Sequence, residues 1–179
     1  MSAGYGHIDP SNKKIALMIA VLALVLAFSE TLGKAAQTNA LSLNIEASNL
    51  WAFFQAKTIR QTVLRTAAEQ PEAISPSSTK LIEQWRKTAQ RSQSEPETGE
   101  GRDELMARAK QAEQKRDRSM AAYHQYELAS AAVQIAIVLA SAAIVTGAMV
   151  LAWIGAGLGI VGVAFCLIGF FAPTSVHIF

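Results

Sequence analysis

Apolar and polar residues are distributed along this chain in blocks. Residues 15–29 and 128–179 contain no Asp, Glu, Lys or Arg, whereas the stretch between them carries nearly every charge. A long uncharged apolar block has no face that water can solvate, so a single soluble globule is excluded. The pattern predicts an all-α membrane protein. We expect three transmembrane helices, with a long extramembrane helical hairpin or bundle between the first and the second of them.

The first apolar segment is bounded by charges on both sides. Lys13 and Lys14 precede it and can reach the membrane surface with their long side chains. At the other end Glu30 and Lys34 are four residues apart in the favourable order, which predicts an interfacial ion pair. A lysine pair before an apolar run is also typical of a signal peptide. Because the Ala-rich helical pattern continues without a break, we predict an uncleaved anchor.

The second apolar block is too long for one crossing. Residues 128–172 as a single helix would measure about 68 Å, over twice the hydrocarbon thickness of about 30 Å. Small residues follow Trp153, an aromatic of the type found at membrane interfaces, and predict a turn near Trp153–Gly157. Pro173 ends the last span. The expected boundaries are 1–14 for an N-terminal tail, 15–33 for span one, 34–127 for the extramembrane helical domain, 128–152 for span two, 158–172 for span three and 173–179 for a C-terminal tail.

Small residues recur every three or four positions in the last two spans. Helices in a bilayer associate where their backbones can approach closely, so these stripes predict a tight helical hairpin, a contact with another subunit, or both. The expected packing positions are Ala136, Ala140, Gly155, Gly159 and Gly162. Gly157, Gly159 and Gly162 also match a dinucleotide-binding spacing, but no acidic residue follows them, so we reject that interpretation.

The polar block begins with a helical stretch that has an unusually wide apolar arc. One stripe comprises Leu41, Ile45, Ala52, Ala56, Ile59 and Val63, with Ser48 as its only polar member, and a second comprises Ala47, Leu50, Phe54, Gln61 and Leu64. A single partner helix needs only a narrow seam. The arc is therefore either buried in a three-helix bundle of one chain or shared with another chain, and both interpretations remain open. The expected interaction residues are Trp51, Ala52, Phe54, Ala56 and Ile59.

Helix-breaking residues divide the rest of the polar block. Pro71 and Pro76 end the long helix, and a serine at 77 or 78 can cap a short helix that runs to about Arg91. The polar stretch 92–101 predicts a loop. From Arg102 no Pro or Gly occurs until Gly147, which predicts one helix from the polar block into span two.

Charge and reactive residues limit the function. Sixteen Lys and Arg residues against 14 Asp and Glu residues argue against nucleic-acid binding, which needs a clustered basic surface. Cys166 is the single cysteine, and His7, His124 and His177 lie on separate segments. No metal spacing or nucleophile motif is present. We therefore expect no catalytic residue, no metal, no cofactor and no enzyme activity.

Two stretches carry a family resemblance. Residues 44–60 (NIEASNLWAFFQAKTIR) and 134–141 (QIAIVLAS) resemble a bacterial membrane family known as domain of unknown function 4337. The most specific positions are Trp51, Ala52, Gln55, Ala56 and Lys57. The order of the segments also matches over nearly the whole chain. Members often have basic residues at the turn between the last two spans, whereas residues 145–159 here have none. The resemblance implies a bacterial protein and almost nothing about its role.

We expect the protein to function by associating with other protein chains. We expect a non-catalytic, multi-pass scaffold of the bacterial inner membrane that contacts lipid and forms homo-oligomers through coiled-coil helices. The alternatives are an accessory subunit that binds other membrane proteins and a transporter or channel component, which would normally need ionisable residues inside the membrane. Lys13 and Lys14 favour a cytoplasmic N-terminus, which predicts a periplasmic helical domain.

Overall fold

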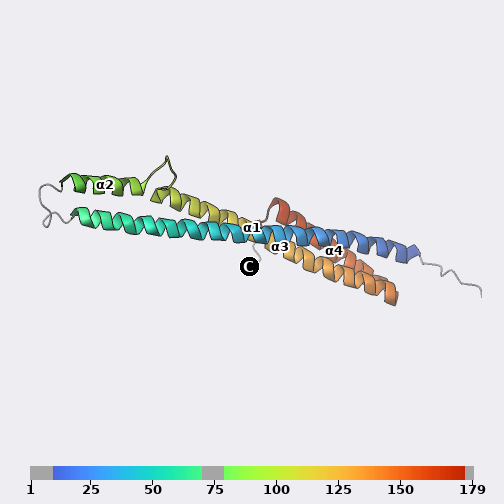
Figure 1. Ribbon diagram of the computed structural model, residues 1–179. Helices are drawn as coiled ribbons and strands as arrows, with labels where there is room; N and C mark the ends of the chain where they lie inside the picture. Colours follow the sequence, from blue (N-terminus) through green and yellow to red (C-terminus); the bar gives the residue numbers. More distant parts are fainter. Residues whose placement is uncertain (1–9, 70–78, 176–179) are drawn as a thin grey trace, which may run out of the picture. The chain divides into compact units, whose positions relative to one another are not determined.

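The computed structural model describes residues 10–69 and 79–175, and these residues form four helices and no strand. The helices are α1 (Pro10–Glu69), α2 (Thr79–Gln93), α3 (Arg102–Thr146) and α4 (Met149–Phe171) (Figure 1). Three of them, α1, α3 and α4, are long and apolar enough to cross a membrane by length and composition. The predicted all-α class is therefore confirmed.

Helix α1 is a single element of 60 residues. Proline is favoured at the first position of a helix, where its missing N–H costs nothing, and Pro10 is the first residue of α1. No other proline occurs between Pro10 and Pro71, and Gly33 is the one glycine within α1. The prediction that the first helix continues into the polar block is confirmed, and α1 ends at Glu69.

Helices α2 and α3 are close to their predicted bounds. Helix α2 runs two residues beyond Arg91, and its proposed serine cap lies outside the described residues. Helix α3 begins at Arg102 and is unbroken for 45 residues, as predicted. Asp103 and Glu104 lie in its first turn, where the free backbone N–H groups favour negative charge.

The turn between α3 and α4 lies earlier than the sequence predicts. Helix α3 ends at Thr146, and Gly147 has a φ of +72°, a conformation that favours glycine. Helix α4 then begins at Met149, so the predicted turn at Trp153–Gly157 is wrong, and so are the limits 128–152 and 158–172. The glycines after Trp153 lie within α4, and Gly155, Gly159 and Gly162 among them are sites of close packing. The Thr146 hydroxyl accepts a hydrogen bond from the Ala148 N–H and fixes the turn.

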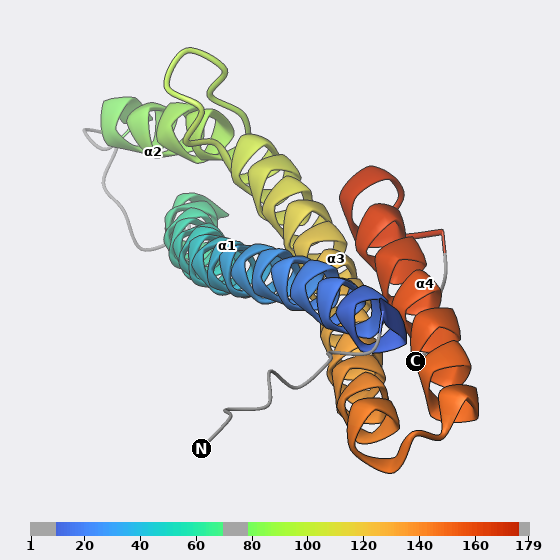
Figure 2. The same cartoon turned by 90° about the vertical axis from the view of Figure 1, so that its right-hand side faces the viewer.

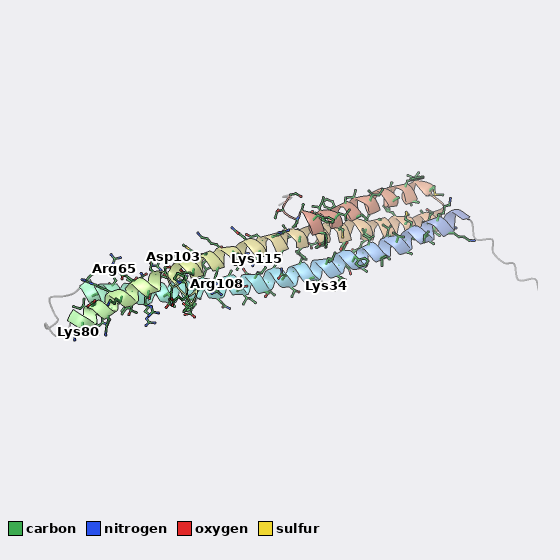
Figure 3. All side chains as sticks on the ribbon, turned by 90° about the horizontal axis from the view of Figure 1, so that it is seen from above. Lys34, Arg65, Lys80, Asp103, Arg108 and Lys115 are labelled. Carbon is green, nitrogen blue, oxygen red and sulfur yellow. The ribbon has the colours of Figure 1, made fainter. Side chains whose placement is uncertain are left out.

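The chain divides into two compact units. The polar unit is Ala40–Arg116, and the apolar unit combines Met1–Asn39 with Asp117–Phe179. Helices α1 and α3 contribute a segment to each unit, α2 belongs to the polar unit, and α4 belongs to the apolar unit. Figure 2 shows α4 alongside the second half of α3. In Figure 3 the labelled side chains of Arg65, Lys80, Asp103, Arg108 and Lys115 all belong to the polar unit.

The turn provides a test of backbone strain. A β-carbon added at Gly147 meets no atom within 4 Å, so a substitution there acts through its positive φ alone. Because asparagine tolerates this conformation and a β-branched residue does not, we expect Gly147→Val to cost about 1–2 kcal/mol and Gly147→Asn clearly less. Unfolding by sodium dodecyl sulfate, followed by circular dichroism, measures the difference. Equal losses for the two variants would contradict the observed turn.

Candidate interaction site

The core of the polar unit is built from small and aliphatic side chains. Ala47 and Leu50 of α1 are buried against three buried residues of α3. These three are Leu105, Ala109 and Ala112, and Leu105 and Ala109 have no exposed surface. Alanine at a helix contact brings the backbones close together, so no larger side chain fits at Ala109 without separating the helices.

Trp51 and Phe54 anchor the edge of this core. Their rings meet edge to face, with centroids 5.5 Å apart and an interplanar angle of 85°. The Trp51 Nε1–H donates a hydrogen bond of 2.9 Å to the Glu113 carboxylate of α3. The Arg102 guanidinium lies 5.1 Å from the centre of the Phe54 ring and donates a hydrogen bond to the Gln61 side chain. Trp51 and Phe54, both expected to be interaction residues, therefore make contacts within one chain.

The loop after α2 is held by charged side chains. Lys57 of α1 lies 3.8 Å from a Glu95 carboxylate oxygen and 3.9 Å from one of Glu100. A hydrogen bond from Arg91 keeps the pKa of Glu95 below its ordinary value, and a hydrogen bond from the Ser94 hydroxyl does the same for Glu104. The sequence indicates a polar loop here, but it does not show that Lys57 joins the loop to α1.

The opposite side of α1 is exposed with respect to the described residues of the polar unit. We call the apolar members of the predicted first stripe, Leu41, Ile45, Ala52, Ala56, Ile59 and Val63, the outer face of α1. All six residues are exposed, and the four larger ones retain 61%, 54%, 65% and 61% of their accessible surface at 41, 45, 59 and 63 respectively. The interpretation in which the whole apolar arc is buried inside one chain is therefore wrong. The second stripe alone packs inward.

Glycines bring α4 against its neighbours in the apolar unit. A β-carbon added at Gly155 would lie 2.9 Å from the backbone oxygen of Ala136 and 3.5 Å from the backbone nitrogen of Ala140. All three residues are buried. Only glycine, which has no β-carbon, fits this close to the backbone of α3 without displacing it. Gly155 therefore marks a point where α3 and α4 approach each other closely.

The same glycine stripe continues along α4. At Gly162 a β-carbon would lie 2.5 Å from Val133 and 3.1 Å from the backbone oxygen of Ala129. At Gly159 it would lie 2.6 Å from the side chain of Leu22, which belongs to α1. One stripe of α4 therefore packs against both other helices of the apolar unit.

The ion pair predicted at the end of the first apolar segment is replaced by another contact. The Gln134 amide of α3 donates a hydrogen bond of 3.4 Å to the Glu30 carboxylate. Glu30 and Lys34 both line the groove between α1 and α3, but no ion pair joins them among the contacts of the described residues. The helical spacing permits the pair, and the neighbouring helix provides a different partner that the spacing cannot show.

The described residues offer no constellation for metal chemistry. No group of three or more His, Cys, Asp or Glu side chains is gathered in residues 10–69 and 79–175. His124 lies on the surface of α3 and approaches Glu127 at 3.7 Å, while His7 and His177 lie outside the described residues.

The fold defines an all-helical protein with three helices capable of crossing a membrane. Residues 11–172 match the family described as Domain of unknown function (DUF4337), and the chain belongs to this family, as its resemblance implies. No curated protein and no solved structure matches the chain. A function for the chain must therefore be argued from its own contacts.

The glycine contacts predict the effect of one added methyl group. In Gly155→Ala the new carbon presses on a backbone oxygen of α3, which can move only if the helices separate. We expect a loss of about 1–3 kcal/mol in unfolding free energy. Gly157→Ala is the matched control, because a β-carbon there meets no atom within 4 Å. Both variants can be compared by unfolding in sodium dodecyl sulfate, and equal stability would contradict the close approach.

Proposed function

We propose that this protein is a non-catalytic membrane scaffold that self-associates through the outer face of α1. One observation carries the proposal: the outer face is apolar and exposed in the polar unit, on a helix whose other face is already packed. Exposed apolar side chains in a membrane-embedded segment need no partner, because lipid covers them. Outside a membrane the same side chains favour a protein contact.

The membrane assignment supports the proposal. Helices α1, α3 and α4 expose large apolar side chains such as Leu17, Phe28, Val138 and Phe170, which suits a surface surrounded by lipid. We place these segments in the bacterial inner membrane. The polar unit then lies outside the bilayer, where it carries most of the charges of the chain. Lys13 and Lys14 favour a cytoplasmic N-terminus, and three spans would place the polar unit in the periplasm.

A second copy of the chain is the partner that suits this surface. Membrane anchoring confines copies to the same plane and raises their effective concentration, so a modest apolar face is sufficient for association. The outer face includes no charged residue that would have to be buried, because its members are Leu, Ile, Ala and Val. A foreign subunit on the same face is the outcome to be distinguished from self-association by experiment.

A charge placed on the outer face tests the proposal. Ile59 is highly exposed, so Ile59→Lys should leave the folded chain intact. Its association should weaken at least tenfold, because burial of the isoleucine is lost and a desolvated charge is introduced. Native mass spectrometry of the purified protein at a series of concentrations measures the oligomer distribution.

The control for this variant is Leu81→Lys, which makes the same kind of change at an exposed position on α2. It should not alter the oligomer distribution. A monomeric wild-type protein, or equal behaviour of the two variants, would contradict self-association through the outer face. Co-purification of a stoichiometric foreign subunit, lost in Ile59→Lys, would instead indicate an accessory subunit.

Orientation can be tested in the loop after α2. A cysteine at the exposed position Glu97, in a Cys166→Ala background, provides a single thiol in the polar unit. We expect a membrane-impermeant maleimide to label it in intact bacterial spheroplasts, since the polar unit would face the periplasm. Labelling that occurs only after lysis would reverse the orientation and leave the self-association proposal untouched.

A further inference from the structure

We propose that two copies of the chain pair through parallel, in-register α1 helices, so that each residue of an exposed heptad seam faces its own counterpart. The seam consists of Ile45, Asn49, Ala52, Ala56, Ile59 and Val63. This inference rests on the proposed self-association and specifies its geometry: the partner is a second copy, and the contact is a short parallel coiled coil outside the membrane.

The packed side of α1 sets the geometry of the helix. Positions 40, 43, 47, 50, 54, 57, 61, 64 and 68 alternate in steps of three and four, and all of them are buried or partly buried. This is the heptad pattern of a helix that supercoils around a neighbour. A strict seven-residue repeat keeps one face of a helix turned toward its partner. Residues separated by seven on any other face of α1 therefore also stay aligned.

The outer side of α1 follows a second heptad pattern. The seam residues are separated by four, three, four, three and four positions, and each is exposed. Phe54 on the packed side lies two residues from both Ala52 and Ala56, which at about 100° per residue places the two seams on opposite faces. Five of the six seam positions are apolar. Without a further partner, the outer heptad positions of a coiled-coil helix are normally polar and solvated.

Asn49 favours a parallel pair. An asparagine at one core position of a coiled coil fixes register, because its amide can bond the same amide of the second chain. In register, Asn49 faces Asn49 of the second copy. In the antiparallel arrangement that places Ala52 opposite Ala56, Asn49 instead faces Ile59, and its amide is buried without a partner. That arrangement would bring Glu46 near Arg60, but an exposed ion pair contributes little.

The residues beside the seam and the anchoring of both copies in one membrane also favour the parallel arrangement. In the parallel register Glu46 adjoins Leu41 of the second copy, and Arg60 adjoins Gln55, so no like charges meet. Two copies anchored by the same segment in one membrane also leave it in the same chain direction. A seam of fewer than three heptads is too short to hold free helices together, whereas membrane anchoring supplies the high effective concentration that it needs.

Disulfide trapping of the full-length chain in liposomes tests the register. The background is Cys166→Ala, which removes the only cysteine. Ile45→Cys and Val63→Cys, each as a single variant, should form covalent dimers under mild oxidation, because a disulfide needs β-carbons about 4 Å apart. Arg65→Cys is the control on the same helix, two residues beyond the seam, and should yield at least fivefold less dimer.

The outcomes distinguish a parallel pair, an antiparallel pair, a different interface and a monomeric protein. Dimers from Ile45→Cys alone and from Val63→Cys alone, with none between the two when they are mixed, establish the parallel pair. Dimers that form only in the mixture overturn it in favour of an antiparallel pair. If native mass spectrometry shows oligomers but none of these cysteines links, the seam is not the interface, although self-association stands. If the protein is also monomeric, the proposed function fails with it.

Discussion

The uninterrupted course of α1 is the constraint on which the other elements depend. Sixty residues at about 1.5 Å each form a helix of about 90 Å, roughly three times the thickness of a bilayer core. Such a helix cannot lie within one membrane crossing. Like α3, it contributes residues to both compact units. Helix α2 packs with the segments of α1 and α3 in the polar unit, and α4 packs with their segments in the apolar unit.

The two units solve the packing of long helices by different means. In the polar unit, alanines form the close contacts, and hydrogen bonds from Trp51 and Arg102 hold the edge of the core. In the apolar unit, glycines of α4 allow close approach to the backbone of α3. The outer face of α1 lies entirely in the polar unit, where its side chains are exposed. Exposure of an apolar surface to lipid is favourable, whereas its exposure to water is unfavourable.

Much of the fold is predictable from the sequence because it depends on local rules. The absence of proline and glycine predicts the continuity of α1 and α3, and three-to-four spacing predicts the packing positions Gly155, Gly159 and Gly162. The position of the turn is not predictable in the same way. Gly147 and Gly155 are the same residue type, and only the neighbouring backbone shows that one bends the chain while the other is packed against α3.

At the candidate site, too, the sequence does not reveal which residues meet across the fold. Two apolar stripes on one helix are visible in the sequence, but their spacing does not reveal which one the chain covers itself. Trp51 and Phe54 pack inward, whereas Ala52, Ala56 and Ile59 remain exposed. Glu30 meets Gln134 instead of Lys34 because α3 runs beside it, a relation between residues far apart in sequence. Membership of the family adds no role to these contacts.

The central claim is that, in the membrane-anchored protein, a second copy covers the outer face of α1. Electron–electron distance measurement on protein in liposomes tests it most directly, with one spin label per chain at position 59 in the Cys166→Ala background. Since each chain carries one label, any defined distance must arise between copies. The account predicts a short, narrow distance distribution that persists when the protein is diluted with excess lipid. A signal from randomly distributed labels alone would contradict it.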